Sequence, residues 1–307
     1  MVNQPSDDVV SAPIRRCWLC GTCGLRRIKE STLRGDPTSR NFEISNADYG
    51  TTAAIDQCVR CGFCQCTDMV DVLKFYEDLE DPAYEMTRPQ RARQKRVLLN
   101  RLPRPTAGAN RLLDVGAGTG ILVEEAIACG YDAIGVEPSR RFCARAKHHG
   151  LPVVQGVLPH PDLTGPYDVV TLVDVVEHVP DPLDLITRAA RLLADGGVLV
   201  VVTPDRSSLL ARIMGDQWWH YRVAHIGYFD PETLRFALAK AGLQQTEFHR
   251  PTWYFPLGYL VERVHRYLPR WARFKVPARL SDLVIPVHLR DSMMVCATKA
   301  QTRDTAP

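Results

Sequence analysis

Seven of the ten cysteines in this chain of 307 residues lie between Cys17 and Cys66. Two Cys-x-x-Cys pairs, Cys17/Cys20 and Cys58/Cys61, are each followed by a glycine, which permits a tight turn around a metal ion. Four thiolates at this spacing suit tetrahedral zinc. The sequence therefore predicts a structural zinc site with the ligands Cys17, Cys20, Cys58 and Cys61.

The same letters permit a second interpretation, because Cys-x-x-Cys-Gly-x-Cys occurs twice and is similar to the cluster loops of ferredoxins. Arg27 and Asp68 stand where the fourth cluster ligand belongs, and no proline follows. Zinc is therefore favoured over an iron–sulfur cluster, and both over cysteines without metal. Cys23, Cys64 and Cys66 are left over as non-ligands.

A second chemical signal is the glycine-rich turn DVGAGTG at residues 114–120, which follows an apolar run. Ile121 stands where a dinucleotide fingerprint needs its third glycine, and no lysine follows as a P-loop requires. Glu137 lies 23 residues after Asp114, at the end of the next apolar run, where a carboxylate can hold both hydroxyls of a ribose. The pattern predicts a nucleoside ligand without phosphates that carries an amino-acid cation.

Strand-like and helix-like segments alternate around this turn. A helix is expected to open at Pro138 and close on Gly150, and another to have Asp181 as N-cap and Pro182 at its first position. β-Branched runs buried on both faces separate the helices, which predicts an α/β fold with a doubly wound, mostly parallel sheet. The expected strands are RLLDVGAG, DAIGVEPS, PVVQG, YDVVTLVDVV, GVLVVVTP, QQTEFHR and SMMVCATK.

Four motifs in order, LLDVGAGTG, GVEPS, YDVVTLVDVVEHVPDP and LLADGGVLVVVTP, resemble the class I S-adenosylmethionine-dependent methyltransferases over about residues 110–250. The resemblance implies seven strands with an antiparallel last strand, and S-adenosylmethionine as cofactor. It places the methionine part on Asp114, Gly116, Ala117, Gly118, Thr119 and Gly120. It places the ribose on Glu137 beside Pro138, the adenine beside Gln155 and Gly156, and the sulfonium above Val173 and Asp174.

The expected organisation is a disordered N-terminus (1–13), a zinc-ribbon module (14–82), a connecting helix (83–108), the methyltransferase domain (109–299) with an inserted basic and aromatic segment (252–291), and a disordered tail (300–307). This arrangement resembles bacterial methyltransferases of sugar and surface-polysaccharide biosynthesis. The chain ends too soon for the additional C-terminal domain of the zinc-containing sugar C-methyltransferases, so their substrate is not carried over. The basic residues of the connecting helix are expected on a solvated face: Arg88, Arg91, Arg93, Lys95, Arg96 and Arg101.

Catalysis on a hydroxyl acceptor needs a base, and histidines follow two of the expected strands. His178 lies after the fourth strand, and His220 and His225 after the fifth, beyond the carboxyl ends where α/β folds bind ligands. His178 and His225 are the predicted catalytic residues, with one of them taking the proton near the ordinary imidazole pKa. The alternative is that each histidine only packs or caps a helix.

The segment PLGYLVERVHRYLPRWARFK collects apolar residues on one helical face and arginines off it. Such a helix can rest on a membrane surface, so contact through residues 256–275 is one prediction. Pro269 interrupts the helix, and packing on the domain's own core is the favoured expectation.

The net charge of +3 gives no overall polybasic character, which argues against nucleic acid as a partner. With no apolar run of membrane-spanning length and no signal-like start, a soluble cytoplasmic protein is expected. The leading prediction is a methyltransferase acting on oxygen of a small molecule, such as a sugar, a glycolipid or another lipid-linked acceptor. The alternatives are a ribosomal-RNA base methyltransferase whose ribbon contacts RNA, and a non-catalytic cofactor-binding docking module. The sequence does not determine the oligomeric state.

Overall fold

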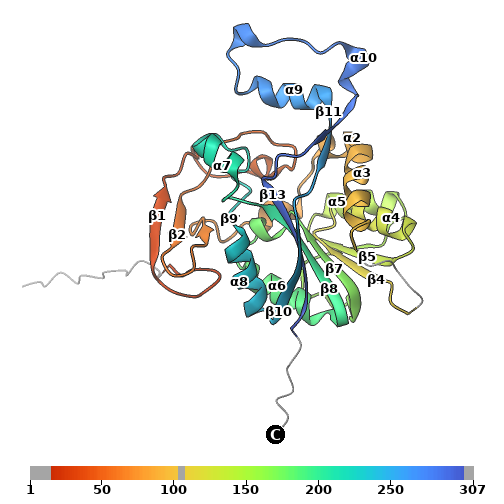
Figure 1. Cartoon of the computed structure of the whole chain (residues 1–307). Helices are drawn as coiled ribbons and strands as arrows, with labels where there is room; N and C mark the ends of the chain where they lie inside the picture. The colour runs from red at the N-terminus through yellow and green to blue at the C-terminus, as the bar shows by residue number, and fades with distance from the viewer. Residues whose placement is uncertain (1–14, 103–107, 301–307) are drawn as a thin grey trace, which may run out of the picture.

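A seven-stranded sheet is the centre of the molecule, in a computed structural model that describes residues 15–102 and 108–300 (Figure 1). Its strands are β4 (Arg111–Val115), β5 (Asp132–Glu137), β6 (Val153–Gln155), β7 (Tyr167–Val173), β8 (Leu193–Pro204), β10 (Leu243–His249) and β13 (Ser292–Lys299). The order is β10-β13-β8-β7-β4-β5-β6, and only β13 runs antiparallel to its neighbours. The predicted fold class and its antiparallel last strand are confirmed.

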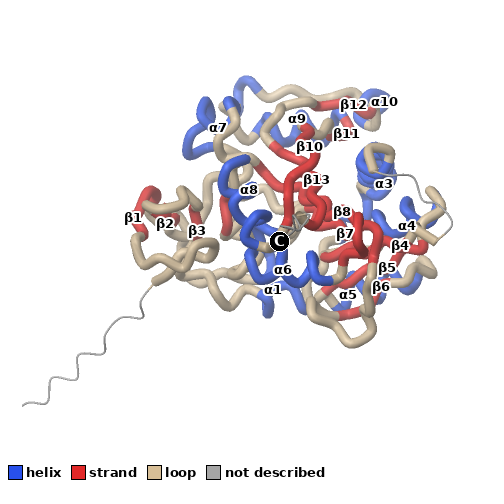
Figure 2. Tube along the Cα trace, turned by 60° about the horizontal axis from the view of Figure 1, so that its bottom comes forward, coloured by secondary structure: helices blue, strands red, loops and turns tan. Residues whose placement is uncertain are grey.

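Helices cover both faces of this sheet (Figures 1 and 2). They are α4 (Ile121–Ala128), α5 (Arg140–His148), α6 (Pro182–Arg191) and α8 (Pro231–Lys240). Leu172 of β7 belongs to the same buried cluster as residues of α6 and α8, whereas Val169 of β7 belongs to a cluster that includes α4. Side chains on the two faces of β7 thus belong to two separate hydrophobic clusters, as expected for a strand buried on both faces.

The predicted helix starts are confirmed in one case and wrong in the other. Asp181 caps α6 by accepting from the backbone N–H of Asp184, and Pro182 occupies the first turn. Helix α5 begins two residues later than expected, because the Ser139 hydroxyl accepts from the N–H of Phe142 and so caps the helix in place of Pro138.

The helix expected over the connecting segment is two helices, α2 (Pro82–Met86) and α3 (Arg88–Leu99). They meet at Thr87, and Pro89 in the first turn of α3 has no N–H with which to continue the preceding helix. The break turns α3 so that it packs on α4.

A smaller four-stranded sheet holds the cysteine-rich region. It contains β1 (Leu25–Lys29), β2 (Ile55–Cys58), β3 (Cys64–Gln65) and β9 (Gly227–Tyr228), in that order and antiparallel throughout. The elements η1 (Ser39–Phe42) and α1 (Leu73–Glu77) follow along the chain and contact each other. Since β9 comes from the transferase part of the sequence, the two parts share one sheet.

The inserted segment forms a projection above the main sheet (Figure 1). Strands β11 (Trp253–Pro256) and β12 (Val284–Val287) pair with each other and carry α9 (Leu257–His265), η4 (Arg270–Ala272) and α10 (Ala278–Ser281). None of these three helices has a buried residue, and Trp271 is 88% exposed. The expected packing on the domain's own core is therefore wrong: the β11–β12 pair carries the segment away from that core.

The predicted disordered segments lie outside the described residues, apart from Ala300. Within the described residues, no helix combines the length and the apolar character that a membrane span needs.

Candidate active site

The glycine-rich turn joins β4 to α4 at the carboxyl edge of the sheet. The N–H groups of Gly116 and Ala117 both donate to the carbonyl oxygen of Val136 on β5. Gly116 has φ +75°, and a Cβ there would lie 2.6 Å from a methyl carbon of Val175, so a side chain is excluded for two reasons. The turn is thereby held against the end of β5, where Glu137 lies.

Glu137 ends β5, and both of its carboxylate oxygens accept hydrogen bonds from the backbone, one of them from the glycine turn. Oε2 accepts from the N–H of Gly118 at 2.8 Å, and Oε1 accepts from the N–H of Ser139 at 2.9 Å. Burial raises the pKa of Glu137 to about 7, against the opposing effect of these two N–H donors. A fixed carboxylate with lone pairs to spare fits the predicted role of holding ribose hydroxyls.

Asp114 is 3% exposed at the end of β4 and accepts from the Thr171 hydroxyl at 2.6 Å. Burial raises its pKa to about 6, while the positive charge of Lys95 on α3 lowers it. Burial in turn lowers the pKa of Lys95. A cationic group brought near Asp114 would compensate the buried carboxylate, which fits the amino-acid end of the expected cofactor.

Helices α2 and α3 cover the glycine turn, which the sequence analysis did not foresee. The Tyr84 hydroxyl lies 3.2 Å from where a Cβ of Gly118 would stand, and the Tyr84 ring stacks on Phe142 of α5. Arg91 lies over the other side of that ring at 4.2 Å, and Arg88 donates to the Thr119 hydroxyl. An aromatic residue two positions after a helix-opening proline was the only sequence signal for this cover.

The expected solvated face is confirmed in part: Arg93, Arg96 and Arg101 are exposed, whereas Arg88, Arg91 and Lys95 are half-buried. Arg88 and Arg96 form ion pairs with Glu124 and Glu125 of α4 at 2.6 and 2.7 Å, and Arg93 lies over the Tyr254 ring at 4.3 Å. Acidic and aromatic partners far away in the sequence make this a helix–helix interface.

The remaining predicted cofactor residues lie along the same edge. The N–H of Gly156 donates to the Glu137 carbonyl oxygen, and the exposed Gln155 lines an open depression of about 340 Å³ beside α5. Pro138 is half-buried between Glu137 and Ser139. Val173 lines a cavity of about 130 Å³ shared with Lys95, and the next residue, Asp174, is exposed with φ +57°.

The two predicted catalytic histidines come together, although 47 positions separate them. His178 ends η2 (Val176–His178), and its ring centroid lies 4.7 Å from that of His225. Burial lowers the pKa of His178 to about 3 and that of His225 well below its usual range, with the charge of Arg222 acting in the same direction. These shifts favour the neutral form of both rings, and the expectation that one of them takes the acceptor proton stays a prediction.

The surrounding aromatic residues form core. His220 stacks on His225 at 5.6 Å, and Trp218 is fully buried with its Nε1–H directed at Asp291. The segment contains α7 (Leu209–Met214) and η3 (Gly215–Gln217), and Leu209 and Ile213 on α7 are exposed.

The four predicted zinc ligands lie together, with their Sγ atoms all within 4.8 Å of one another. The Sγ atoms of Cys17 and Cys61 are 3.5 Å apart, as are those of Cys20 and Cys58, close to the roughly 3.8 Å edge that Zn–S bonds of about 2.3 Å give. The glycines after each pair, Gly21 and Gly62, have positive φ, as the predicted turns require. Cys23 is exposed and Cys64 and Cys66 are buried outside the cluster.

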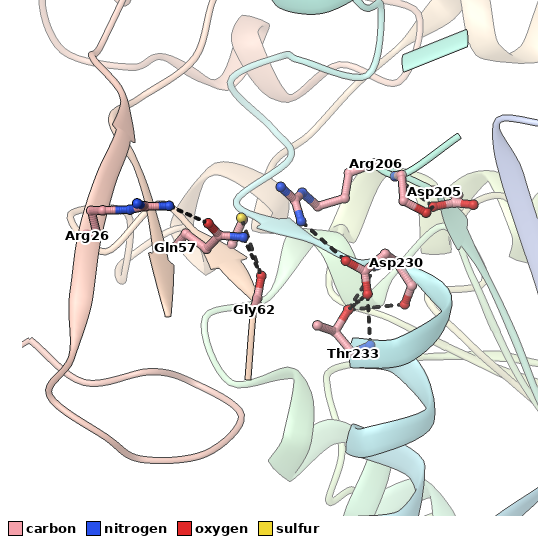
Figure 3. A network of polar contacts seen from close by, with 9 residues as sticks. Arg26, Gln57, Gly62, Asp205, Arg206, Asp230 and Thr233 are labelled. Atoms are coloured by element: carbon pink, nitrogen blue, oxygen red, sulfur yellow. Dashed lines mark hydrogen bonds and ion pairs between the residues drawn. The ribbon is translucent and has the colours of Figure 1, made fainter. Parts of the chain in front are cut away.

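This module is joined to the histidine region by short contacts. Phe63 packs on Phe229 at 4.8 Å, the N–H of Cys66 donates to the Ile226 carbonyl, and the N–H of Ile226 donates to the Glu177 carbonyl. Figure 3 shows the polar networks on either side: Gln57 bridges Arg26 and the Gly62 carbonyl, and across from it Arg206 pairs with Asp230 at the start of α8.

Comparison with known proteins agrees with this geometry. A family model described as a methyltransferase domain matches residues 86–247. A ubiquinone biosynthesis O-methyltransferase of Cereibacter sphaeroides is 33% identical over 159 residues, which cover 47% of this chain and 64% of the relative. The corresponding protein of Marinobacter nauticus is 33% identical over 127 residues, 38% of this chain and 53% of the relative. A SAM-dependent methyltransferase structure from Thermotoga maritima matches with 23% identity and a TM-score of 0.46, covering 71% of this chain and 95% of that one.

The sheet order, the glycine turn and the acid that ends β5 define a class I S-adenosylmethionine-dependent methyltransferase domain. The chain belongs to the methyltransferase domain family matched over residues 86–247. The matched segments span less than two thirds of the length of the curated relatives named above.

Proposed function

We propose that this protein transfers the methyl group of S-adenosylmethionine to an oxygen atom of a small molecule. The observation that carries the proposal is the fixed position of Glu137 against the glycine turn, with Asp114 buried on the neighbouring strand. Methyl transfer to oxygen is supported by relatives named O-methyltransferases.

We place the acceptor beside His178 and His225, the proposed catalytic residues, which follow the carboxyl ends of β7 and β8. In the reaction the acceptor oxygen forms a bond to the methyl carbon as the carbon–sulfur bond breaks. The bonding pair stays on sulfur, and the hydroxyl proton leaves to solvent. The acceptor is proposed to be a sugar, a glycolipid or another small or lipid-linked hydroxyl compound.

The test uses S-adenosylmethionine with a tritiated methyl group and three acceptor classes: a catechol with a prenyl chain, a set of nucleotide sugars, and ribosomal RNA. We expect alkali-stable label in a small-molecule product. Label in RNA would replace this proposal with base methylation. Cofactor binding without transfer to any class, or to a cell extract, would favour a docking module.

We also propose that Cys17, Cys20, Cys58 and Cys61 hold a structural zinc ion. Support comes from the spacing of their sulfur atoms, which is close to that of a tetrahedral zinc thiolate site. Thiolate zinc sites persist where thiols stay reduced, which supports the further proposal of a cytoplasmic location.

We propose, finally, that the projection formed by 253–287 contacts an anionic membrane surface. Trp271 and Phe274 are 88% and 55% exposed. Around them the segment 257–283 has six arginines or lysines against two acids, listed here as Arg263, Arg266, Arg270, Arg273, Lys275 and Arg279 against Glu262 and Asp282. Exposed aromatics among basic residues are typical of interfacial segments.

A further inference from the structure

Glu177 is a buried carboxylate that lies close to both proposed catalytic histidines. One ligand atom from each of Glu177, His178 and His225 lies within 4.8 Å of the other two. Glu177 is 2% exposed and His225 is 6% exposed, so the group is shielded from water. The Cys17/Cys20/Cys58/Cys61 cluster is the other such group among the described residues.

Two atoms of this group have no hydrogen-bond partner although they are buried: Glu177 Oε1 and His225 Nδ1. The other carboxylate oxygen of Glu177 is used, since Oε2 accepts from the Thr203 hydroxyl at 2.9 Å. A buried acceptor without a partner costs about 1–3 kcal/mol, more when it is charged. A ligand that accepts electron pairs would give both atoms, Glu177 Oε1 and His225 Nδ1, a partner.

The hydrogen bonds of the histidines leave one lone pair free on each ring. His178 Nδ1 lies 2.9 Å from the Ala224 carbonyl oxygen and 2.7 Å from the Tyr76 hydroxyl oxygen. Because the carbonyl oxygen can only accept, we assign the proton to Nδ1, with Tyr76 as a second acceptor, and this leaves the lone pair of Nε2 free. That Nε2 atom lies 4.0 Å from Glu177 Oε1. The His225 ring lies beside the backbone of His220, and its buried Nδ1 atom has no hydrogen-bond partner. Orientation of ligand histidines by backbone carbonyls is typical of metal sites.

We propose that Glu177, His178 and His225 bind a divalent cation of the zinc, manganese or cobalt type. Two imidazoles and one carboxylate are a common donor set for such ions, and three protein ligands leave positions open for another molecule. The guanidinium of the neighbouring Arg222 donates to the backbone carbonyls of Glu43 and Ile44, so it has partners other than Glu177 Oε1, which has none.

A cation here has a consequence for the proposed function, on which this part of the inference rests. Bound to the acceptor oxygen, it favours the deprotonated oxygen that attacks the methyl carbon, so that neither buried histidine has to serve as the base. Cation binding itself can be measured without any methyl transfer. A failure of the metal site and a failure of the methyltransferase proposal are therefore distinguishable.

The experiment loads the full chain with zinc, removes excess metal, and titrates it with Mn²⁺ followed by electron paramagnetic resonance and with Co²⁺ followed by visible absorption. We expect one further ion per chain, with weak Co²⁺ bands typical of nitrogen and oxygen ligands. Glu177→Gln keeps the shape and the Thr203 contact, and we expect it to weaken binding at least tenfold, as we expect for His225→Asn. His249→Ala, which changes a half-buried histidine on β10, is the matched control and should bind as the unchanged protein does.

Thermal unfolding gives a second readout. Added Mn²⁺ should raise the melting temperature of the unchanged protein but not that of Glu177→Gln, whose folding without metal is checked by its circular dichroism and zinc content. The proposal is overturned if no further ion binds at millimolar concentration. It is equally overturned if Glu177→Gln and His225→Asn bind as tightly as the unchanged protein, or if Co²⁺ shows only thiolate charge-transfer bands.

Discussion

Glu137 illustrates how one side chain both shapes and serves a site. Its two carboxylate oxygens accept hydrogen bonds from the backbone N–H groups of Gly118 and Ser139, so the carboxylate cannot rotate freely. Keeping this carboxylate ionised costs free energy, because burial raises the pKa of Glu137 to about 7. Hydrogen bonds from ribose hydroxyls would offset that cost, because they favour the ionised form.

Replacing Glu137 by alanine removes the proposed ribose contact. We expect Glu137→Ala to weaken S-adenosylmethionine binding by on the order of 2–3 kcal/mol, because charge-assisted hydrogen bonds are lost. Isothermal titration calorimetry measures the change. Asp132→Ala, at the exposed opposite end of β5, is the control and should bind normally. Equal affinity of both variants would remove Glu137 from the cofactor site.

The raised pKa of Glu137 predicts a pH dependence of cofactor binding. Below about pH 7 the carboxyl of the free protein is protonated, and a ribose donor needs the carboxylate, so affinity should rise with pH between about 5.5 and 7.5. Binding should release a proton, measured by calorimetry in two buffers of different ionisation enthalpy. Glu137→Gln should leave only the component from Asp114, centred near pH 6. A flat profile in the unchanged protein contradicts the prediction.

At the scale of elements, the two-residue strand β9 links the cysteine module to the proposed catalytic histidines. It pairs with β3, which follows the second cysteine pair, and its first residue comes two positions after His225. The backbone of Ile226 continues the link to Glu177. A metal ion that stabilises the cysteine module would therefore also hold the segment next to His225 and Glu177 in place.

We expect the purified protein to contain one zinc ion per chain and to be colourless. Cys58→Ser should lose the zinc and increase amide hydrogen exchange both in the module and at residues 224–229, because β3 no longer holds β9. The exposed Cys23, outside the cluster, provides the control, and Cys23→Ser should change neither. Iron in elemental analysis, or a brown protein, would show a cluster instead. Unchanged exchange at 224–229 in Cys58→Ser would refute the coupling.

At the scale of the whole molecule, the projection is attached through the β11–β12 pair and a few side contacts. The Tyr267 hydroxyl donates to the Gln217 carbonyl, and Arg263 donates to the Ser45 carbonyl. These contacts tie α9 to the segment after α7 and to the cysteine-rich region, leaving Trp271 and Phe274 outward. The exposed side of the projection could therefore contact a flat lipid surface without any change in the main sheet.

Vesicle binding checks the membrane proposal. The protein should sediment with vesicles of phosphatidylcholine and phosphatidylglycerol, weakly with phosphatidylcholine alone, and less at high salt. Trp271→Ala combined with Phe274→Ala should reduce binding about tenfold, since two aromatic anchors are lost. Ile127→Ala, an exposed apolar change on α4, is the control. Equal binding by both variants would move the contact elsewhere.

Local patterns in the chain were sufficient to predict the main sheet, the glycine-rich turn and the gathering of four cysteines. Glycines at 116, 118 and 120 are needed because the backbone there has positive φ, and paired cysteines followed by glycine form the same turn in any context. The inner strands β4, β7 and β8 of the main sheet are largely buried on both faces, and such strands consist of long apolar runs that the sequence shows directly. Each of these signals comes from residues that are neighbours in the sequence, so it can be recognised without knowing the tertiary contacts.

Contacts between residues far apart in the sequence could not be predicted in this way. Tyr84 over the glycine turn, Lys95 near Asp114, the strand β9 and the meeting of Glu177 with His225 depend on which surfaces pack together. A two-residue strand has no periodicity, and a glutamate next to a histidine reads the same whether it is solvated or buried. The arginines of α3 lacked visible partners for the same reason, since Glu124 and Glu125 lie on another helix. Packing selects these pairs, because burying an unpaired charge costs more than a local preference can offset.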